Sequence, residues 1–268
     1  MDRKLGVQSL FDEVSPTYDS TGIDFFGQIA RALVRYARLR AGSTVLDVGC
    51  GAGAALTAAS EAVGANGRVL GIDLARGMVN RAQRLVEQRS LDNVRVEVGD
   101  AEAPPTPPGS VDAIVASLVL FFLPNIDVTL DAYATTLVPG GTLAFSTFGA
   151  EDDWEPLDRL LARFVPDATP SQDEAWFESA AGIDAKLRAH GFGAVSIEET
   201  THQVDFPSVA SFHEWTWSTG WRETWRSVPP ERLEAAKAAV DEELRSRARG
   251  DGSLRLATAV RYSRAETV

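Results

Sequence analysis

Short runs of apolar residues alternate along the first half of the chain with longer segments of mixed polarity. The runs at 44–46, 69–73, 93–98, 110–117 and 136–149 have the length and the β-branched content of strands. The segments between them, among them 52–59 and 77–89, are rich in helix-forming residues. Strands and helices in this alternating order predict an α/β fold with a doubly wound, mostly parallel sheet.

The second half of the chain predicts two more strands and two insertions. Strands are expected at 191–201 and 252–264, and Gly191 ends the helix that precedes the first of them. We therefore expect a seven-stranded sheet whose last strand is antiparallel. The segments 151–178 and 206–250 are extra to this sheet and emerge where open α/β sheets bind ligands, so they predict a helical cap.

A glycine-rich turn, VLDVGCGAGAAL, follows the first predicted strand. Gly49, Gly51 and Gly53 let the backbone turn sharply and approach a ligand that a Cβ atom would exclude. The helix that follows directs free N–H groups and its positive end at the turn. The pattern predicts a cofactor site, and read literally it satisfies the dinucleotide fingerprint G-x-G-x-x-G/A.

Two acidic residues bear on which cofactor binds. Asp47 places a carboxylate beside the turn, where it would repel a pyrophosphate and favour S-adenosylmethionine, which carries a sulfonium and an ammonium. Asp73 ends the next apolar strand, 20 residues after Gly53, a spacing that suits hydrogen bonds to ribose hydroxyls. Asp73 serves either ligand, so Asp47 is the residue that discriminates between them.

Five motifs then occur in a fixed order: VLDVGCGAG, GIDLA, VGDAE, VDAIVAS and LVPGG. In order and spacing the chain resembles the class I, Rossmann-like S-adenosylmethionine-dependent methyltransferases over residues 10–149. The segment FDEVSPTYDS is similar to the N-terminal part of the ubiquinone/menaquinone C-methyltransferase-like branch. The resemblance implies S-adenosylmethionine as cofactor and one domain over 1–268, divided into an N-terminal lid (1–40), a cofactor-binding core (41–149) and cap inserts (151–178 and 206–250).

The resemblance also implies a role for each matched position. The methionine part of the cofactor is expected to contact Asp47, Gly49, the backbone of Cys50, Gly51 and the carbonyl of Ser117. The ribose and adenine are expected to contact Asp73, Leu74, Met78, Asp100 and Ala101. Tyr18 matches the aromatic residue of the segment that closes over the cofactor. Packing in the helix core is a nearly equal interpretation for Met78.

The composition of the chain narrows the classes of molecule that it is expected to bind. A net charge of −12 in 268 residues provides no positive field for a nucleic-acid backbone. The longest apolar run, 113–123, is too short to span a bilayer, and the charged start of the chain predicts no signal peptide. With one cysteine, an internal disulfide or a cysteine-based metal site is not expected. These features predict a cytoplasmic enzyme, monomeric or homodimeric, with no metal, membrane or nucleic-acid partner.

The second insert contains four of the six tryptophans. Trp217, Trp221 and Trp225 are spaced as one stripe of a single helix. This stripe packs the insert onto the sheet in one interpretation; in the other it forms flat walls for an aromatic acceptor, with Trp217 as the candidate contact. By analogy with the family, Phe26 and Phe122 are expected to touch the substrate.

Catalysis by this class needs little from the protein, because the sulfonium is an activated methyl donor and alignment supplies much of the rate. A general base would help a phenol or carbon acceptor, and Tyr18 and His202 are the candidates. We favour proximity alone. The sequence predicts methyl transfer to O, C or N of an aromatic or terpenoid-like specialised metabolite. Two alternatives stay open: methylation of a quinone ring carbon, and a protein that binds S-adenosylmethionine without transferring the methyl group.

Overall fold

The computed structural model describes residues 3–150, 153–165 and 176–268. Its sheet contains seven strands in the order β3-β2-β1-β4-β5-β7-β6. The strands are β1 (Thr44–Val48), β2 (Arg68–Asp73), β3 (Val94–Val98), β4 (Val111–Ser117), β5 (Leu137–Phe148), β6 (Phe192–Phe206) and β7 (Leu254–Thr267). Strands β1 to β5 pair in parallel, whereas β7 is antiparallel to both of its neighbours, β5 and β6. The predicted doubly wound sheet with an antiparallel last strand is confirmed.

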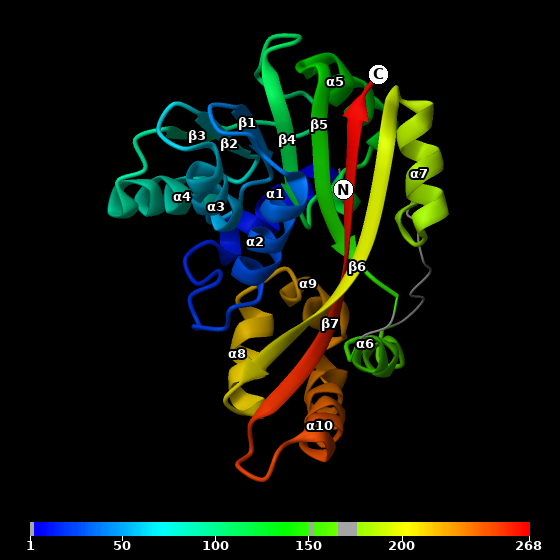
Figure 1. Cartoon of the computed structure of the whole chain (residues 1–268). Helices are drawn as coiled ribbons and strands as arrows, with labels where there is room; N and C mark the ends of the chain where they lie inside the picture. Colours follow the sequence, from blue (N-terminus) through cyan, green and yellow to red (C-terminus); the bar gives the residue numbers. More distant parts are fainter. Residues whose placement is uncertain (1–2, 151–152, 166–175) are drawn as a thin grey trace.

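Helices cover both faces of the sheet (Figure 1). They are α1 (Arg3–Val14), α2 (Phe26–Ala37), α3 (Ala54–Val63), α4 (Arg76–Arg89), α5 (Ile126–Thr136), α6 (Glu155–Ala162), α7 (Ala180–Ala189), α8 (Val209–Trp217), α9 (Arg222–Ser227) and α10 (Pro230–Arg247), with a short 3₁₀ turn η1 (Leu120–Phe122). Successive strand residues point to opposite faces. Val45 therefore belongs to the apolar cluster that includes residues of α2 and α3, while Leu46 belongs to the cluster under α5 and α7.

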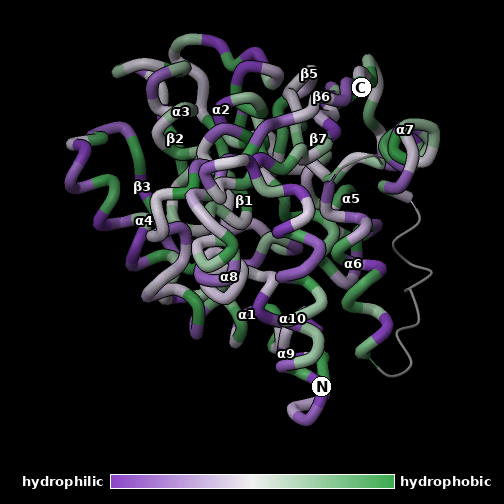
Figure 2. The backbone as a smooth tube through the Cα atoms, turned by 90° about the horizontal axis from the view of Figure 1, so that it is seen from below, coloured by the Kyte–Doolittle hydropathy of each residue, from purple (hydrophilic) through white to green (hydrophobic). Residues whose placement is uncertain are grey.

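The last two strands are longer than the sequence pattern predicts. β6 continues five residues beyond the expected end at Thr201, and its distal part stays paired with β7 from Gln203 opposite Ala257 to Phe206 opposite Leu254. In Figure 1 this two-stranded ribbon leaves the sheet at its lower edge and carries α8, α9 and α10. The ribbon is therefore the stalk of the cap. Seen from below, the cap helices lie close to α1 (Figure 2).

The expectation of one helix through the four tryptophans of the second insert is wrong. α8 ends at Trp217, and α9 begins at Arg222. Ser218 caps the end of α8, its N–H and hydroxyl both donating to the carbonyl of Trp215. Small hydroxyl residues and glycine favour such local turns over a continuing helix, which explains why the run Ser-Thr-Gly at 218–220 breaks the stripe.

Candidate functional site

A cavity of about 520 Å³ lies at the carboxyl ends of β1, β2 and β4. Three parts of the chain line it: the strand ends with their following turns, the N-terminal segment, and the cap. Among the sequence-predicted residues it brings together Tyr18, Phe26, Gly49, Gly51, Asp73, Leu74, Asp100, Ala101, Ser117 and Phe122. The cavity is therefore one space with two halves. The strand-end half is lined by the strand ends and the turns after them, and the aromatic half is lined by aromatic rings of the N-terminal segment, the segment after β4 and the cap.

The glycine turn borders the cavity with its backbone. Gly49 and Gly51 have φ values of +62° and +54°, which residues with a Cβ atom rarely adopt. A Cβ at Gly51 would meet no atom within 4 Å, whereas one at Gly49 would lie 2.6 Å from Val119. Gly51 therefore leaves open space for a ligand, while Gly49 allows close packing against the segment after β4.

Asp73 holds the same turn from the neighbouring strand. Its Oδ2 accepts a hydrogen bond from the N–H of Gly51 at 2.9 Å, and its Oδ1 accepts one from the N–H of Ala75 at 2.8 Å. Burial raises the pKa of Asp73, and the two backbone hydrogen bonds act in the opposite direction. A carboxylate can accept further hydrogen bonds, so Asp73 keeps capacity for ligand hydroxyls.

Asp47 is buried beneath the turn, and it does not line the cavity. Its side chain is 1% exposed, and neither carboxylate oxygen has a hydrogen-bond partner within the described residues. Burial raises the pKa of Asp47 well above its ordinary value, and the nearby charge of Asp73 adds to this. A buried carboxyl group without partners is costly, and a cationic group of a ligand would offset that cost.

The N-terminal helix covers the strand-end half of the cavity. Lys4 donates to Oδ2 of Asp100 at 2.7 Å and also pairs with Glu102. Asp12 accepts a hydrogen bond from the N–H of Gly77 at 2.7 Å, at the start of α4, and Gln8 donates to the carbonyl of Leu74. These contacts place α1 directly over the ends of β2 and β3.

Aromatic rings from three separate segments form the other half of the cavity. Tyr18 stacks on Phe26 with centroids 5.0 Å apart, and Phe26 stacks on Trp215 at 5.9 Å. Phe122 lines the same space and meets the edge of Phe11 at 5.4 Å. Further apolar lining comes from Phe25, Phe121, Phe148, Trp154 and Trp221. The arrangement suits a flat, apolar ligand.

Besides Asp47, four predicted site residues lie outside the cavity. Both backbone polar groups of Cys50 are used within the fold, because its N–H donates to Ile72 and its carbonyl accepts from Gly53. Met78 is fully buried in a small cluster beneath α1, as in its helix-core interpretation. His202 hydrogen-bonds Tyr262 at 2.6 Å on the β6–β7 ribbon, outside the cavity. The side chain is therefore not placed to act as a base.

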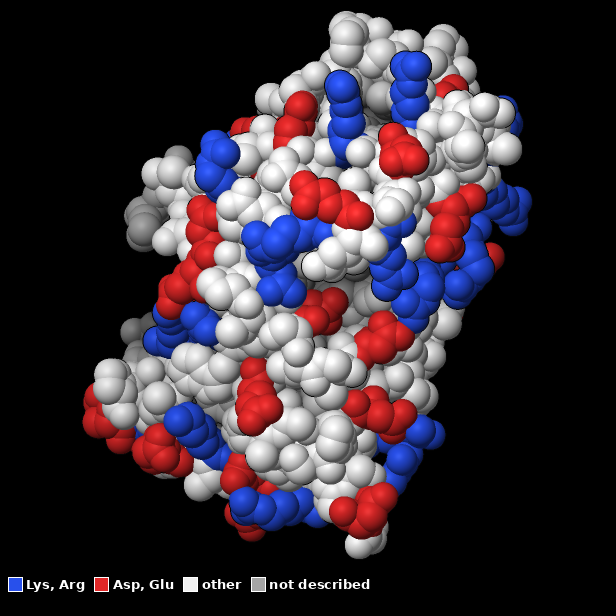
Figure 3. Space-filling view, turned by 90° about the vertical axis from the view of Figure 1, so that its left-hand side faces the viewer, with Lys and Arg blue, Asp and Glu red and all other residues white. Residues whose placement is uncertain are grey.

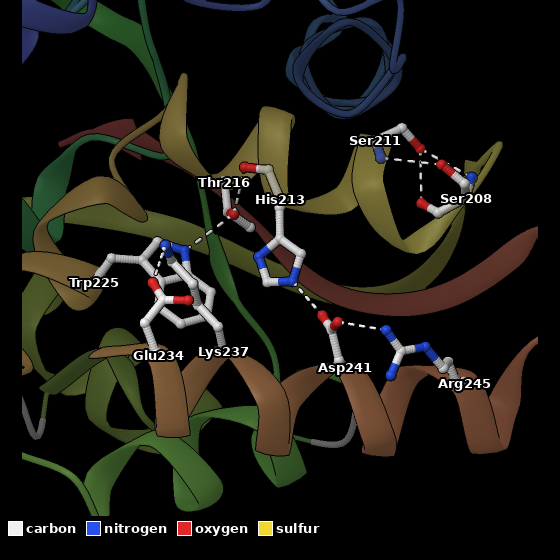
Figure 4. A network of polar contacts seen from close by, with 9 residues as sticks. All are labelled: Ser208, Ser211, His213, Thr216, Trp225, Glu234, Lys237, Asp241 and Arg245. Atoms are coloured by element: carbon white, nitrogen blue, oxygen red, sulfur yellow. Dashed lines mark hydrogen bonds and ion pairs between the residues drawn. The ribbon is translucent and has the colours of Figure 1, made fainter. Parts of the chain in front are cut away.

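Trp217 is the fourth of these residues. Its ring stacks on that of Trp225 at 6.3 Å, and Lys237 lies 5.9 Å from its centroid. Figure 4 shows the polar network around the ring of Trp225, in which Nε2 of His213 contacts Asp241 at 2.6 Å. This contact ties α8 to α10. Trp217 thus packs the cap together, and Trp215, two residues earlier, is the tryptophan of α8 that lines the cavity.

Several lining residues escaped the sequence analysis. Lys4, Trp154, Thr219 and Gly220 lie in segments without a recognisable motif, and Phe11 begins the segment FDEVSPTYDS, in which only Tyr18 was assigned a role. The spacing of Val7 and Phe11, one helical turn apart, is a signal that could have pointed to α1 as a lining element.

Within the described ranges, no group of three or more His, Cys, Asp or Glu residues is arranged to hold a metal ion. No helix in those ranges combines the length and the apolar character needed to cross a membrane. On the face shown in Figure 3, basic and acidic side chains are interspersed. That face carries no continuous basic surface.

Comparison with known proteins identifies the class. Residues 45–141 match a family described as methyltransferase domain. Nocamycin O-methyltransferase from Saccharothrix syringae is 34% identical over 90% of this chain and 91% of its own length. Aklanonic acid methyltransferase DauC from a Streptomyces species is 36% identical over 70% of this chain and 92% of its own length. The chain belongs to the methyltransferase family and is an S-adenosylmethionine-dependent methyltransferase.

Solved structures agree with this assignment. A SAM-dependent methyltransferase from Aquifex aeolicus, 28% identical, covers 62% of this chain and 81% of its own with a TM-score of 0.50. The YcgJ protein from Bacillus subtilis covers 90% of this chain and 98% of its own with a TM-score of 0.59 at 19% identity. The second likeness concerns the fold alone. Demethylmenaquinone methyltransferases are similar at a lower level, for example 27% over 72% of this chain.

Proposed function

We propose that this methyltransferase transfers a methyl group to an oxygen atom of a flat, multi-ring small molecule, an aromatic specialised metabolite. The observation that carries the proposal is the continuous stack of Tyr18, Phe26 and Trp215 within the same cavity as the glycine turn. Two relatives are named for nocamycin and aklanonic acid, and one of them is named an O-methyltransferase. Both observations favour a specialised metabolite over a protein or nucleic acid.

The residues of the strand-end half fit S-adenosylmethionine. We assign Asp73 to the ribose hydroxyls, Asp100 and Ala101 to the adenine, and the turn at Gly49 and Gly51 to the methionine part. The unpartnered carboxyl group of Asp47 supports a role near the ammonium. When bound, the cofactor supplies an electrophilic methyl group on sulfur. The protein supplies position: the glycine turn sets one end of the donor, and the aromatic walls hold the acceptor.

No side chain of the aromatic half is assigned as a general base. Tyr18 is the sequence-predicted candidate that lies in the cavity, and burial raises its pKa well above the ordinary value, so the phenol keeps its proton. A phenol acidified by conjugation with a ring carbonyl loses its proton to solvent before it binds, and its anionic oxygen then takes the methyl group from sulfur without such a base. Orientation between flat walls then accounts for catalysis.

The test uses 1,8-dihydroxyanthraquinone as a flat, multi-ring probe that carries two phenolic hydroxyls. Binding to the protein loaded with S-adenosylhomocysteine should quench tryptophan fluorescence, because Trp154, Trp215 and Trp221 line the cavity. Incubation with S-adenosylmethionine should give a product heavier by one methylene unit, with the new methyl group on oxygen. A carbon-methylated product would favour the quinone alternative. A protein that binds both molecules and leaves S-adenosylmethionine unconverted would contradict methyl transfer to this acceptor class.

A further inference from the structure

One wall of the cavity is the turn between α8 and α9, whose own hydrogen bonds are local: Ser218 N–H donates to Glu214 and Trp215, and Glu223 N–H donates to Gly220. Thr219, Gly220 and Trp221 line the cavity between the end of α8 and the start of α9. The turn lies against α1, because a Cβ at Gly220 would be 3.8 Å from the ring of Phe11. Phe11 itself lines the same cavity. The local bonds shape the turn, and its position relative to the N-terminal side of the cavity also involves the contact between α1 and α9.

Arg222 closes the turn. Its Nε donates to the carbonyl of Trp217 at 2.7 Å, which joins the last residue of α8 to the first residue of α9. Its Nη1 donates to Oε1 of Glu13 at 3.1 Å. The Arg222 side chain is only 18% exposed. The guanidinium thus bridges both sides of the turn and fixes them to the end of α1.

Arg226, one helical turn further on, binds the same carboxylate. Its Nη1 donates to Oε2 of Glu13 at 2.8 Å, and its Nη2 contacts Oε1. Hydrogen bonding from Arg226 lowers the pKa of Glu13, so the carboxylate is charged at neutral pH. Single exposed ion pairs contribute little to stability. Here Arg226 binds both oxygens of the Glu13 carboxylate and Arg222 binds one of them. Such a bidentate contact fixes the relative position of α1 and α9.

We propose that Glu13 is a positioning residue for the acceptor: by holding Arg222 and Arg226 it sets the place of the wall at residues 219–221. The proposal rests on the proposed function, which assigns the aromatic half of the cavity to the acceptor. Glu13 does not line the cavity. It acts through Arg222, and its effect is separable from cofactor binding, because Lys4 and Asp12 hold the other contacts of α1 over the strand ends.

The test compares Glu13→Gln with the natural protein, both saturated with S-adenosylhomocysteine. Amide hydrogen exchange over residues 216–226 should become about five- to tenfold faster in the variant, because the turn loses its tie to α1. The dissociation constant of 1,8-dihydroxyanthraquinone, read by tryptophan fluorescence, should rise by a similar factor. The dissociation constant of S-adenosylhomocysteine should stay within about threefold.

Two further variants control the result. Glu61→Gln removes an exposed carboxylate from α3 and should change none of the three readouts. Adding Glu13→Gln to the double variant Arg222→Gln/Arg226→Gln, in which the Glu13 carboxylate has already lost both partners, should not speed the exchange further. Unchanged exchange over 216–226 in folded Glu13→Gln would overturn the proposal. Failure of the natural protein to bind the anthraquinone would count against the proposed acceptor class, while the exchange readout would still decide the role of Glu13.

Discussion

The carboxylate of Asp73 accepts a hydrogen bond from the backbone N–H of Gly51, so the residue assigned to the ribose also holds the glycine turn. Asp73→Ala should therefore weaken cofactor binding in two ways, by removing a ligand contact and by loosening the turn. We expect a loss of roughly 1.5–3 kcal/mol in binding free energy. Calorimetric titration with S-adenosylhomocysteine measures it, and Asp73→Asn, which keeps one acceptor oxygen, should lose less. Equal affinity in all three proteins would remove Asp73 from the site.

Gly51 should matter for cofactor binding, whereas Gly49 should matter for stability. Gly51→Val places its side chain in the open space beside the cavity and should abolish binding of S-adenosylhomocysteine while the protein stays folded. Gly49→Val should lower the melting temperature, because its Cβ lies 2.6 Å from Val119. Titration calorimetry and thermal melts on both variants separate the two effects. Cofactor binding of natural strength by Gly51→Val would make that position purely structural.

The strand-end half of the site could be predicted because its determinants are local in sequence. The turn, Asp73 and Asp100 each lie at the carboxyl end of a strand with a clear apolar pattern, and parallel strands bring these ends to one edge. The depth of Asp47 was not predictable in this way. A strand pattern gives the face of a residue, whereas its distance from solvent depends on α2 and α3, which pack over it.

Asp47 should couple cofactor binding to pH. Because burial raises its pKa, a fraction of the ligand-free protein carries a neutral carboxyl group, and pairing with the cofactor ammonium favours the charged form. Affinity should therefore rise with pH, and binding should release protons. Titration calorimetry in buffers of different ionisation enthalpy measures that release. Asp47→Asn should bind more weakly and release none; an identical release from this variant would assign the proton to another group.

The raised pKa of Asp47 should also make the stability of the ligand-free protein depend on pH. The folded-state pKa of Asp47 is raised, so the folded protein binds this proton more tightly than the unfolded chain does. Its contribution is fully present below the unfolded pKa and is lost as pH rises through the folded pKa. Asp47→Asn should consequently be more stable than the natural protein at pH 8. Denaturant unfolding at pH 5 and pH 8 tests this, and a variant equally destabilised at both values would contradict it.

The pH dependence of turnover should not involve His202. The ring hydrogen-bonds Tyr262 away from the cavity, and burial lowers its pKa, with a contribution from Arg35. His202→Gln should therefore leave the shape of the pH–rate profile unchanged, with 1,8-dihydroxyanthraquinone as the acceptor. A lost limb of the profile would show that the histidine reaches the reacting atoms.

The sequence predicts a cap, but its contacts could not be predicted because they join distant parts of the chain. Glu13 and Arg226 are 213 positions apart, and no local pattern in either segment identifies the other. The tryptophan spacing indicated a single helix, yet three small residues at 218–220 end it and turn α9 away. As a result the aromatic residue that reaches the cavity from α8 is Trp215, which does not belong to the apparent stripe.

Trp215 and Trp217 should respond oppositely to truncation. Trp217 stacks on Trp225 outside the cavity, so Trp217→Ala should lower the melting temperature and leave the affinity for 1,8-dihydroxyanthraquinone unchanged. Trp215 is 2% exposed and stacks on Phe26. Trp215→Phe keeps an aromatic core residue and should raise the dissociation constant of the anthraquinone about tenfold. Phe122→Ala should also weaken binding of the anthraquinone and leave the affinity for S-adenosylhomocysteine unchanged. Should Trp217→Ala impair acceptor binding in a fully folded protein, the wall of the cavity would extend beyond the residues assigned to it.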